Sequence, residues 1–245
     1  MKPLDWPFPR WIAHRGAGKL APENTLAAFR LGSRHGYRAF ECDVKLSRDG
    51  VPFLLHDDTL ERTTNAGGDA GARPWAELSQ LDAGAWHSRA FAGEPLASLA
   101  AIAAFCLRNR HALNIEIKPS PTRERETGEV VAREAAKLWT GQALPPLLSS
   151  FKPESLEGAM AGAASLPRAL LLDTLWDGWF ERAQALGCVA VVADHKLFDR
   201  ALVERLHGAG LRALAYTVND ESAAAVLTGI GLDGLITDAV DRFAP

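Results

Sequence analysis

The sequence is poor in cysteine, in long apolar runs and in net charge, and each shortage excludes a class of protein. Its three cysteines, Cys42, Cys106 and Cys188, lie far apart in apolar segments, so they indicate reduced packing residues rather than a disulfide framework or a zinc site. The longest apolar stretch, around residues 99–107, is mostly alanine and too short to cross a bilayer. The sequence therefore predicts no association with a membrane.

The weak net charge and the first ten residues bear on the partners and the cellular location of the protein. A formal net charge of −3 at pH 7 provides no basic surface for neutralising nucleic-acid phosphates, so we expect no nucleic-acid partner. Pro3, Pro7 and Pro9 interrupt the N-terminal segment, where a secretion signal needs a continuous apolar run. We expect a cytoplasmic location, and the oligomeric state stays open.

Short β-type runs alternate with helix-type runs along the whole chain, which is typical of βα units around a parallel sheet. The expected strands are 11–14, 38–44, 112–117, 147–150, 168–172, 188–193, 211–217 and 234–237. Asn24 or Thr25 can cap a helix that ends near Gly36, and Asp199 can cap one that ends near residues 208–210. Eight such units favour an α/β chain folded as a closed (β/α)8 TIM barrel over an open doubly wound sheet.

One stretch breaks this alternation. Residues 57–95 are rich in turn formers and have no long helical periodicity. They follow an apolar run, 51–56, that extends the second unit. We expect a single domain, 1–245, in which 57–95 form a small insertion after the second βα unit and lie over one rim of the barrel.

Acidic side chains gather where two of the expected strands end. Glu41 and Asp43 point to the same face of their strand because side chains alternate with period two, and Glu116 ends the next strand. Unpaired carboxylates inside a barrel cost several kcal/mol unless a cation neutralises them. Carboxylate oxygens suit a hard divalent ion, Mg²⁺ or Ca²⁺. The alternative is a set of ordinary ion pairs with Arg15 or Lys118.

Three histidines follow apolar strands and should lie at the same rim. His14 and His56 come directly after such runs, and an imidazole can serve as acid or base near neutral pH. The alternative is a structural role, which is the commoner one for any single histidine. His195 ends the sixth expected strand, and it could contact substrate or form a structural hydrogen bond with Asp194.

An ordered set of motifs resembles the glycerophosphodiester phosphodiesterases, in particular their short cytoplasmic bacterial type. The motifs are His14-Arg15-Gly16, Pro22-Glu23-Asn24-Thr25, Glu41-Cys42-Asp43, His56-Asp57, Glu116-Ile117-Lys118 and Asp233-Gly234-Leu235-Ile236-Thr237-Asp238. The resemblance covers residues 11–238, which is nearly the whole chain. It implies a (β/α)8 barrel with a small insertion. It also implies that deacylated phospholipids, such as glycerophosphocholine and glycerophosphoethanolamine, are cleaved to sn-glycerol 3-phosphate and an alcohol.

The resemblance also implies roles for individual residues. His14 and His56 match the family's acid and base, and one divalent cation would be held by the three acids, Glu41, Asp43 and Glu116. Arg15 and Lys118 match cations that face the phosphate. Tyr216 stands where the family usually has tryptophan, which bears on how the glycerol or the leaving group fits.

Other readings of the same residues remain open. A glycoside hydrolase would use the paired carboxylates but would leave both histidines and both cations idle. A non-catalytic barrel could retain the pocket as a binding site. The glycines of segment 16–21 match a dinucleotide-binding pattern, but Pro22 interrupts the helix that this pattern requires. The head group, the choice between Mg²⁺ and Ca²⁺, and the nucleophile are undetermined, although a tethered glycerol 2-hydroxyl is favoured over water.

Overall fold

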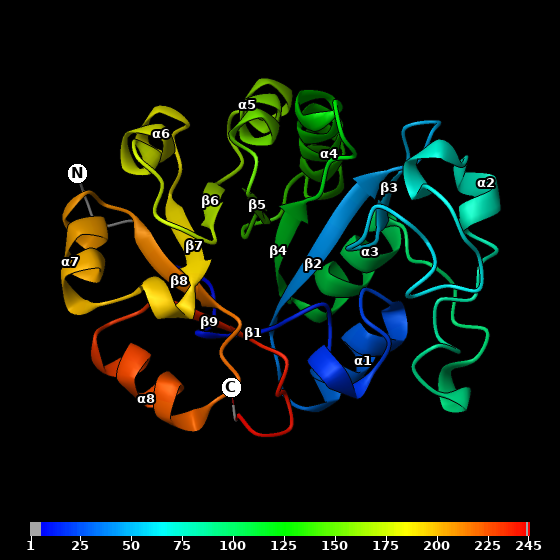
Figure 1. Ribbon diagram of the computed structural model, residues 1–245, viewed down its shortest axis with the longest axis horizontal. Coiled ribbons are helices and arrows are strands. Elements are labelled where there is room, and N and C mark those ends of the chain that lie inside the picture. Colours follow the sequence, from blue (N-terminus) through cyan, green and yellow to red (C-terminus); the bar gives the residue numbers. More distant parts are fainter. Residues whose placement is uncertain (1–5, 244) are drawn as a thin grey trace.

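Eight parallel strands close into a barrel in the computed structural model, which describes residues 6–243 and 245 (Figure 1). They are β1 Trp11–Ala13, β2 Ala39–Leu46, β4 Ala112–Ile117, β5 Leu147–Ser150, β6 Arg168–Leu172, β7 Ala190–Asp194, β8 Arg212–Tyr216 and β9 Gly234–Thr237. Each strand pairs with the next around the ring, and β1 pairs with both β9 and β2. The expected (β/α)8 barrel is confirmed. Part of the N-terminal segment on which the expected location rests lies outside the described residues.

Helices connect the strands and cover the outside of the barrel (Figure 1). They are α1 Leu26–Arg34, α3 Leu99–Asn109, α4 Glu124–Leu138, α5 Pro153–Gly162, α6 Trp179–Ala185, α7 Arg200–Gly208 and α8 Glu221–Gly229. The predicted caps are present: the Thr25 side chain accepts a hydrogen bond from Ala28 N, and the Asp199 side chain accepts one from Leu202 N. Among the described helices, none is both long and apolar enough to span a membrane.

The alternation along β2 separates the packing face of this strand from its chemical face. Phe40, Cys42, Val44 and Leu46 belong to the cluster that packs beneath the helices, whereas Glu41, Asp43 and Lys45 occupy the alternate positions of the strand and are also buried. All three cysteines are free and buried, as expected for packing residues. A third apolar cluster, which includes Phe8, Ile12, Ala39, Leu171 and Ile236, fills the barrel interior beneath the polar groups.

The predicted insertion follows β3, Pro52–Leu54, which pairs antiparallel with β2. It contains two short 3-10 helices, Ala70–Ala72 and Arg89–Phe91, and the one-turn helix α2, Trp75–Leu78. The helix of the second unit, α3, comes only after this segment. The expected position is therefore corrected: the segment lies within the second βα unit, between its strand and its helix. Ser98 caps α3 directly after the segment, and the segment packs in a small apolar cluster together with Phe53, Leu55 and Leu96.

Candidate active site

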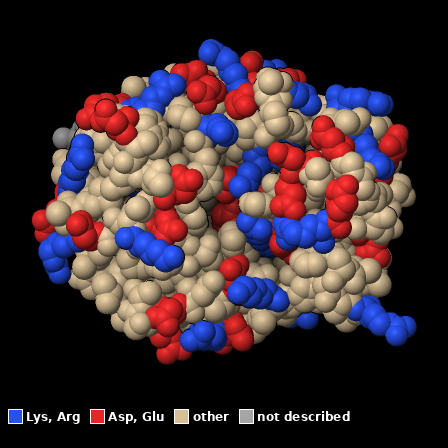
Figure 2. Space-filling model, viewed as in Figure 1, with Lys and Arg blue, Asp and Glu red and all other residues tan. Residues whose placement is uncertain are grey.

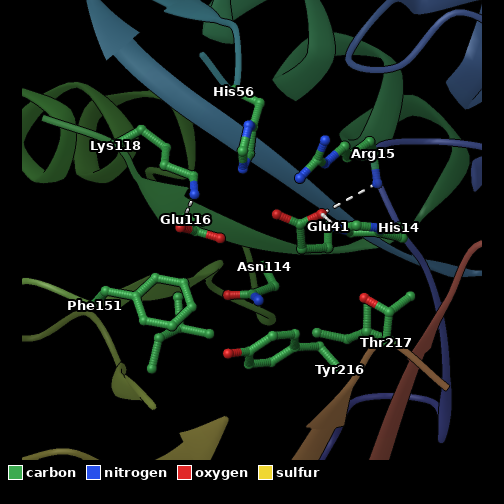
Figure 3. Close-up of a pocket in the computed structure, with 12 residues that line it drawn as sticks. His14, Arg15, Glu41, His56, Asn114, Glu116, Lys118, Phe151, Tyr216 and Thr217 are labelled. Carbon is green, nitrogen blue, oxygen red and sulfur yellow. Dashed lines mark hydrogen bonds and ion pairs between the residues drawn. The ribbon is translucent and has the colours of Figure 1, made fainter. Parts of the chain in front are cut away.

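Three buried carboxylates converge at the carboxyl ends of β2 and β4, and Figure 3 shows two of them, Glu41 and Glu116. Asp43 and Glu116 are register partners on these neighbouring strands, and Glu41 lies two residues before Asp43. One carboxylate oxygen from each of the three lies within 4.8 Å of the others. The sequence predicted this convergence from strand periodicity, and we refer to Glu41, Asp43 and Glu116 as the acidic triad.

Burial and mutual repulsion oppose full ionisation of the acidic triad. Burial raises the pKa of Glu41 well above its ordinary value, and the charges of Asp43 and Glu116 raise it further. Burial, followed by the charge of Asp43, raises the pKa of Glu116 to about 7. Burial also opposes ionisation of Asp43, but Arg15 and Lys118 keep its pKa below the ordinary value. A divalent cation would supply the missing charge.

The acidic triad also has free oxygen atoms for such a cation. Oε1 of Glu41 and Oδ1 of Asp43 are buried and accept no hydrogen bond from the described residues. Buried polar atoms normally have a partner, and unbonded carboxylate oxygens are the ligands that Mg²⁺ and Ca²⁺ take in proteins. The residues present therefore fit a divalent cation. Asn24 holds Asp43 in place, because its Nδ2 donates a hydrogen bond to Asp43 Oδ2 at 2.8 Å.

Two cationic side chains lie on either side of the acidic triad. Arg15 Nε lies 3.1 Å from Asp43 Oδ2, and the Arg15 backbone N–H donates to Glu41 Oε2 at 3.1 Å. Lys118 Nζ lies 2.7 Å from Glu116 Oε1 and 3.7 Å from Asp43 Oδ1. Both side chains also line the cavity beside the acidic triad. They can therefore face an anion bound there, and contact of both with a phosphate stays a prediction.

His14 is held by an acid from the far end of the chain. Its Nδ1 lies 2.6 Å from Asp238 Oδ1, and Asn219 Nδ2 donates to the other oxygen of that carboxylate at 3.2 Å. The hydrogen bonds from His14 and Asn219 keep the pKa of Asp238 low against the effect of burial, so Asp238 is the acceptor and His14 Nδ1 carries a proton. A Cβ on Gly18 would lie 2.1 Å from the carbonyl oxygen of Asp238, so this close approach requires glycine.

His56 is held by a chain of ion pairs. Its Nδ1 lies 2.8 Å from Asp57 Oδ1. Arg62 binds Asp57 through Nε at 2.6 Å, and it donates to both oxygens of Glu23 at 2.8 Å. Glu23 also accepts from Arg15 NH1 at 2.9 Å. Burial lowers the pKa of His56, and the neighbouring cations Arg15 and Lys118 lower it further. Asp43 and Asp57 act in the opposite direction and raise it, but by less.

A cavity of about 170 Å³ brings these groups together (Figure 3). It is lined by His14, Arg15, Glu41, His56, Asn114, Glu116, Lys118, Phe151, Leu171, Tyr216, Thr217 and Ile236. The sequence analysis expected seven of these residues at the site. It did not expect the other five, which are Asn114, Phe151, Leu171, Thr217 and Ile236. Tyr216 forms part of the wall, and its hydroxyl donates to the carbonyl oxygen of Leu172 at 3.1 Å.

His195 is not brought to this cavity. It begins the short 3-10 helix after β7, and its Nδ1 lies 3.6 Å from the carboxylate of its neighbour Asp194. The two side chains thus lie next to one another without a hydrogen bond between them, and substrate contact by His195 stays a prediction. Conversely, Asp238, Asn219, Arg62 and Glu23 had been assigned no role. Glu23 and Asp238 belong to the motifs on which the family resemblance rests, and membership in these motifs was the signal that could have identified the two residues.

Comparison with known proteins identifies the family. Residues 14–242 match the glycerophosphoryl diester phosphodiesterase family. The chain belongs to this family. The Bacillus subtilis (strain 168) protein YhdW is 33% identical over 240 residues, which cover 94% of each chain. The Caldanaerobacter subterraneus glycerophosphodiester phosphodiesterase is 29% identical over 231 residues and 93% of each chain.

A solved structure is similar throughout its length. A phosphodiesterase from Oleispira antarctica, determined in complex with the product sn-glycerol-3-phosphate, is 36% identical and superposes with a TM-score of 0.89 over 96% of this chain and 95% of its own. This chain is accordingly an enzyme of the phosphodiesterase class. Membership in this family argues against the alternative of a glycoside hydrolase, a mechanism that assigns no role to the histidines and cations lining the cavity.

Proposed function

We propose that this chain hydrolyses glycerophosphodiesters to sn-glycerol 3-phosphate and an alcohol, with His14 and His56 as acid and base. The observation that carries the proposal is the meeting of two imidazoles, two cations and the acidic triad around one small cavity. A phosphodiester needs these three things: charge neutralisation at its oxygens, a base for the nucleophile and an acid for the leaving alkoxide. The product bound in the Oleispira antarctica relative supports the same substrate class.

The walls of the cavity support a glycerol end that points inward. Phe151, Leu171, Tyr216 and Ile236 give the cavity an apolar wall, and Figure 3 shows the rings of Phe151 and Tyr216 next to one another in it. A volume of about 170 Å³ suits a three-carbon unit rather than a whole phospholipid head. The glycerol backbone would pack on this wall, which excludes water, and its phosphate would lie against Arg15 and Lys118.

The two histidines are prepared for proton transfer at the same ring atom. Asp238 and Asp57 engage Nδ1 of His14 and His56 respectively. Nε2 of each ring is then the atom left for substrate, and in His14 this atom lies 3.7 Å from Glu41 Oε2. In the neutral ring with a proton on Nδ1, Nε2 is a base, and in the charged ring it is an acid. One histidine takes the proton of the nucleophile at Nε2, and the other delivers a proton to the departing alcohol.

The acidic triad would hold one divalent cation, Mg²⁺ or Ca²⁺. When bound, this ion supplies positive charge for the phosphate oxygens and lowers the pKa of an oxygen ligand. The protein supplies the position of that charge, because Asn24 fixes Asp43 and the Arg15 backbone fixes Glu41.

The proposed function predicts release of sn-glycerol 3-phosphate from several head groups in a coupled assay, and its loss when a chelator removes divalent ions. Addition of Mg²⁺ or Ca²⁺ should then restore the activity, and the rates restored by each ion show which of the two the enzyme prefers. Turnover that survives complete chelation would contradict a metal-dependent mechanism. Tight binding of glycerophosphodiesters without turnover would instead show a non-catalytic barrel.

We further propose that the glycerol 2-hydroxyl is the nucleophile and forms a cyclic phosphate that water then opens. The hydroxyl is tethered beside the phosphorus, and a well-oriented intramolecular group lowers a barrier by roughly 7 kcal/mol relative to an untethered one. A substrate without this hydroxyl, propane-1,3-diol phosphocholine, is expected to show a kcat about a hundredfold below that of glycerophosphocholine, because a positioned water replaces the hydroxyl only in part. Similar kcat values for the two substrates would identify direct attack by water.

A further inference from the structure

A second cavity adjoins the catalytic one and shares a wall with it. It has a volume of about 420 Å³. It is lined by Lys45, His56, Asp57, Asp58, Glu116, Ile117, Lys118, Pro119, Ser150, Phe151 and Lys152. His56, Glu116, Lys118 and Phe151 line both cavities. A diester whose glycerol fills the first cavity and whose phosphate meets Lys118 can therefore extend its alcohol into the second, which we name the head-group cavity.

A third cavity, on the His14 side, is a weaker candidate for the alcohol. Its volume is about 410 Å³, and it shares only His14 and Arg15 with the catalytic cavity. Its other walls include Lys19, Glu23 and Trp86. The shared wall is thus larger on the His56 side, where four side chains continue from one cavity into the other.

Most charges of the head-group cavity are already balanced. Lys45 is almost fully buried, and its Nζ lies 2.6 Å from Asp58 Oδ1. Asp57 is bound by Arg62, and Lys118 by Glu116. The two remaining features, Lys152 and the phenyl ring of Phe151, decide which head group the cavity suits.

Lys152 brings a positive charge to the head-group cavity. Its side chain is exposed at the start of α5 and has no ion-pair partner among residues 6–243 and 245. The first turn of α5 adds partial positive charge of the same sign, which the carboxylate of Glu154 in that turn opposes. Figure 2 shows both basic and acidic side chains beside the hollow near the centre of this face.

The same cavity is poorly suited to a quaternary ammonium group. Apart from His56, the cavity is lined by one aromatic side chain, that of Phe151. The Phe151 ring already receives a cation, because Lys118 Nζ lies 5.5 Å from the ring centroid. A choline group would therefore find no aromatic cage of the kind that recognises such cations.

We propose that the head-group cavity receives the leaving alcohol and that Lys152 makes it select head groups that carry a negatively charged group. This inference rests on the proposed function and specifies its substrate class: glycerophosphodiesters whose alcohol bears a carboxylate or a further phosphate. Lys152 acts as a specificity-determining residue, through attraction across a partly solvated gap, and takes no part in proton transfer.

Two substrates that differ by one carboxylate test the proposal. Glycerophosphoserine is glycerophosphoethanolamine with a carboxylate added to the alcohol, so the ratio of their kcat/KM values isolates that group. We expect the ratio to exceed one in the parent enzyme and to fall about threefold to fivefold in Lys152→Gln, as for loss of an exposed ion pair. Lys152→Arg should restore it. Added salt should lower the ratio in the parent and have little effect on it in Lys152→Gln.

Matched variants separate the proposal from a general effect of charge. Lys137→Gln, on the exposed end of α4, removes one positive charge far from the cavity and should leave the ratio unchanged. A parent ratio of one or less, or the same ratio in Lys152→Gln as in the parent, would overturn the inference while leaving the proposed function intact. A ratio that falls in Lys19→Gln instead would place the alcohol on the His14 side. If neither substrate is hydrolysed, the proposed function fails, and this inference fails with it.

Discussion

Replacing Glu116 with Gln is expected to lower kcat/KM for glycerophosphodiesters by at least about a thousandfold, because metal activation contributes several kcal/mol and each 1.36 kcal/mol is a factor of ten. Gln preserves the shape of the side chain but removes one of the three charges that can hold the cation. Affinity for Mg²⁺ and Ca²⁺ should fall in parallel in titration calorimetry.

The fold should survive this substitution. Glu116 lies beside Asp43 in a buried site that raises its pKa to about 7, so a neutral amide relieves repulsion there when no metal is bound. The thermal unfolding midpoint of the metal-free variant should therefore be no lower than that of the parent. Glu204→Gln, an exposed position on α7, is the matched control and should retain full activity. Normal metal affinity in Glu116→Gln would remove Glu116 from the proposed site.

His14→Ala and His56→Ala are each expected to lower kcat by about a thousandfold, within the range for loss of a general acid or base. The double variant should be hardly slower than the worse single variant, because two groups that act in one proton relay fail as a unit. Steady-state kinetics on one substrate with saturating metal measures all three variants.

Two further observations sharpen the test of the histidine pair. His35→Ala removes an exposed imidazole at the end of α1 and should leave kcat unchanged. The pH dependence of kcat should lose one limb in each single variant. Strictly multiplicative losses in the double variant, or a pH profile that neither substitution alters, would argue against a shared acid–base role.

Local patterns in the sequence were sufficient to predict much of the barrel and the centre of its site. The alternation along the expected strand 38–44 identified Glu41 and Asp43 as partners on one face, because side-chain direction on a strand depends only on parity. Thr25 and Asp199 were recognisable as helix caps because a cap is made within four residues. His14 and His56 could be placed at the active rim because each directly follows an apolar run.

Contacts between distant parts of the chain could not be predicted in this way. His14 and Asp238 are separated by 224 positions, and Arg62 reaches Glu23 from the insertion across 39 positions. The apolar wall of the cavity draws Phe151, Leu171 and Ile236 from three different strands or strand ends. No local pattern distinguishes these side chains from other residues of the same type.

The sequence by itself determined the parallel barrel, the strand-end acids and the two histidines, because strand periodicity, capping and the shared edge of parallel strands act over short distances. Only the tertiary structure decided which acid supports each histidine, that His195 stays with Asp194, and that the insertion precedes α3. The physical reason is closure of the barrel, since the pairing of β1 with both β2 and β9 brings His14 and Asp238, which follow β1 and β9, to one rim.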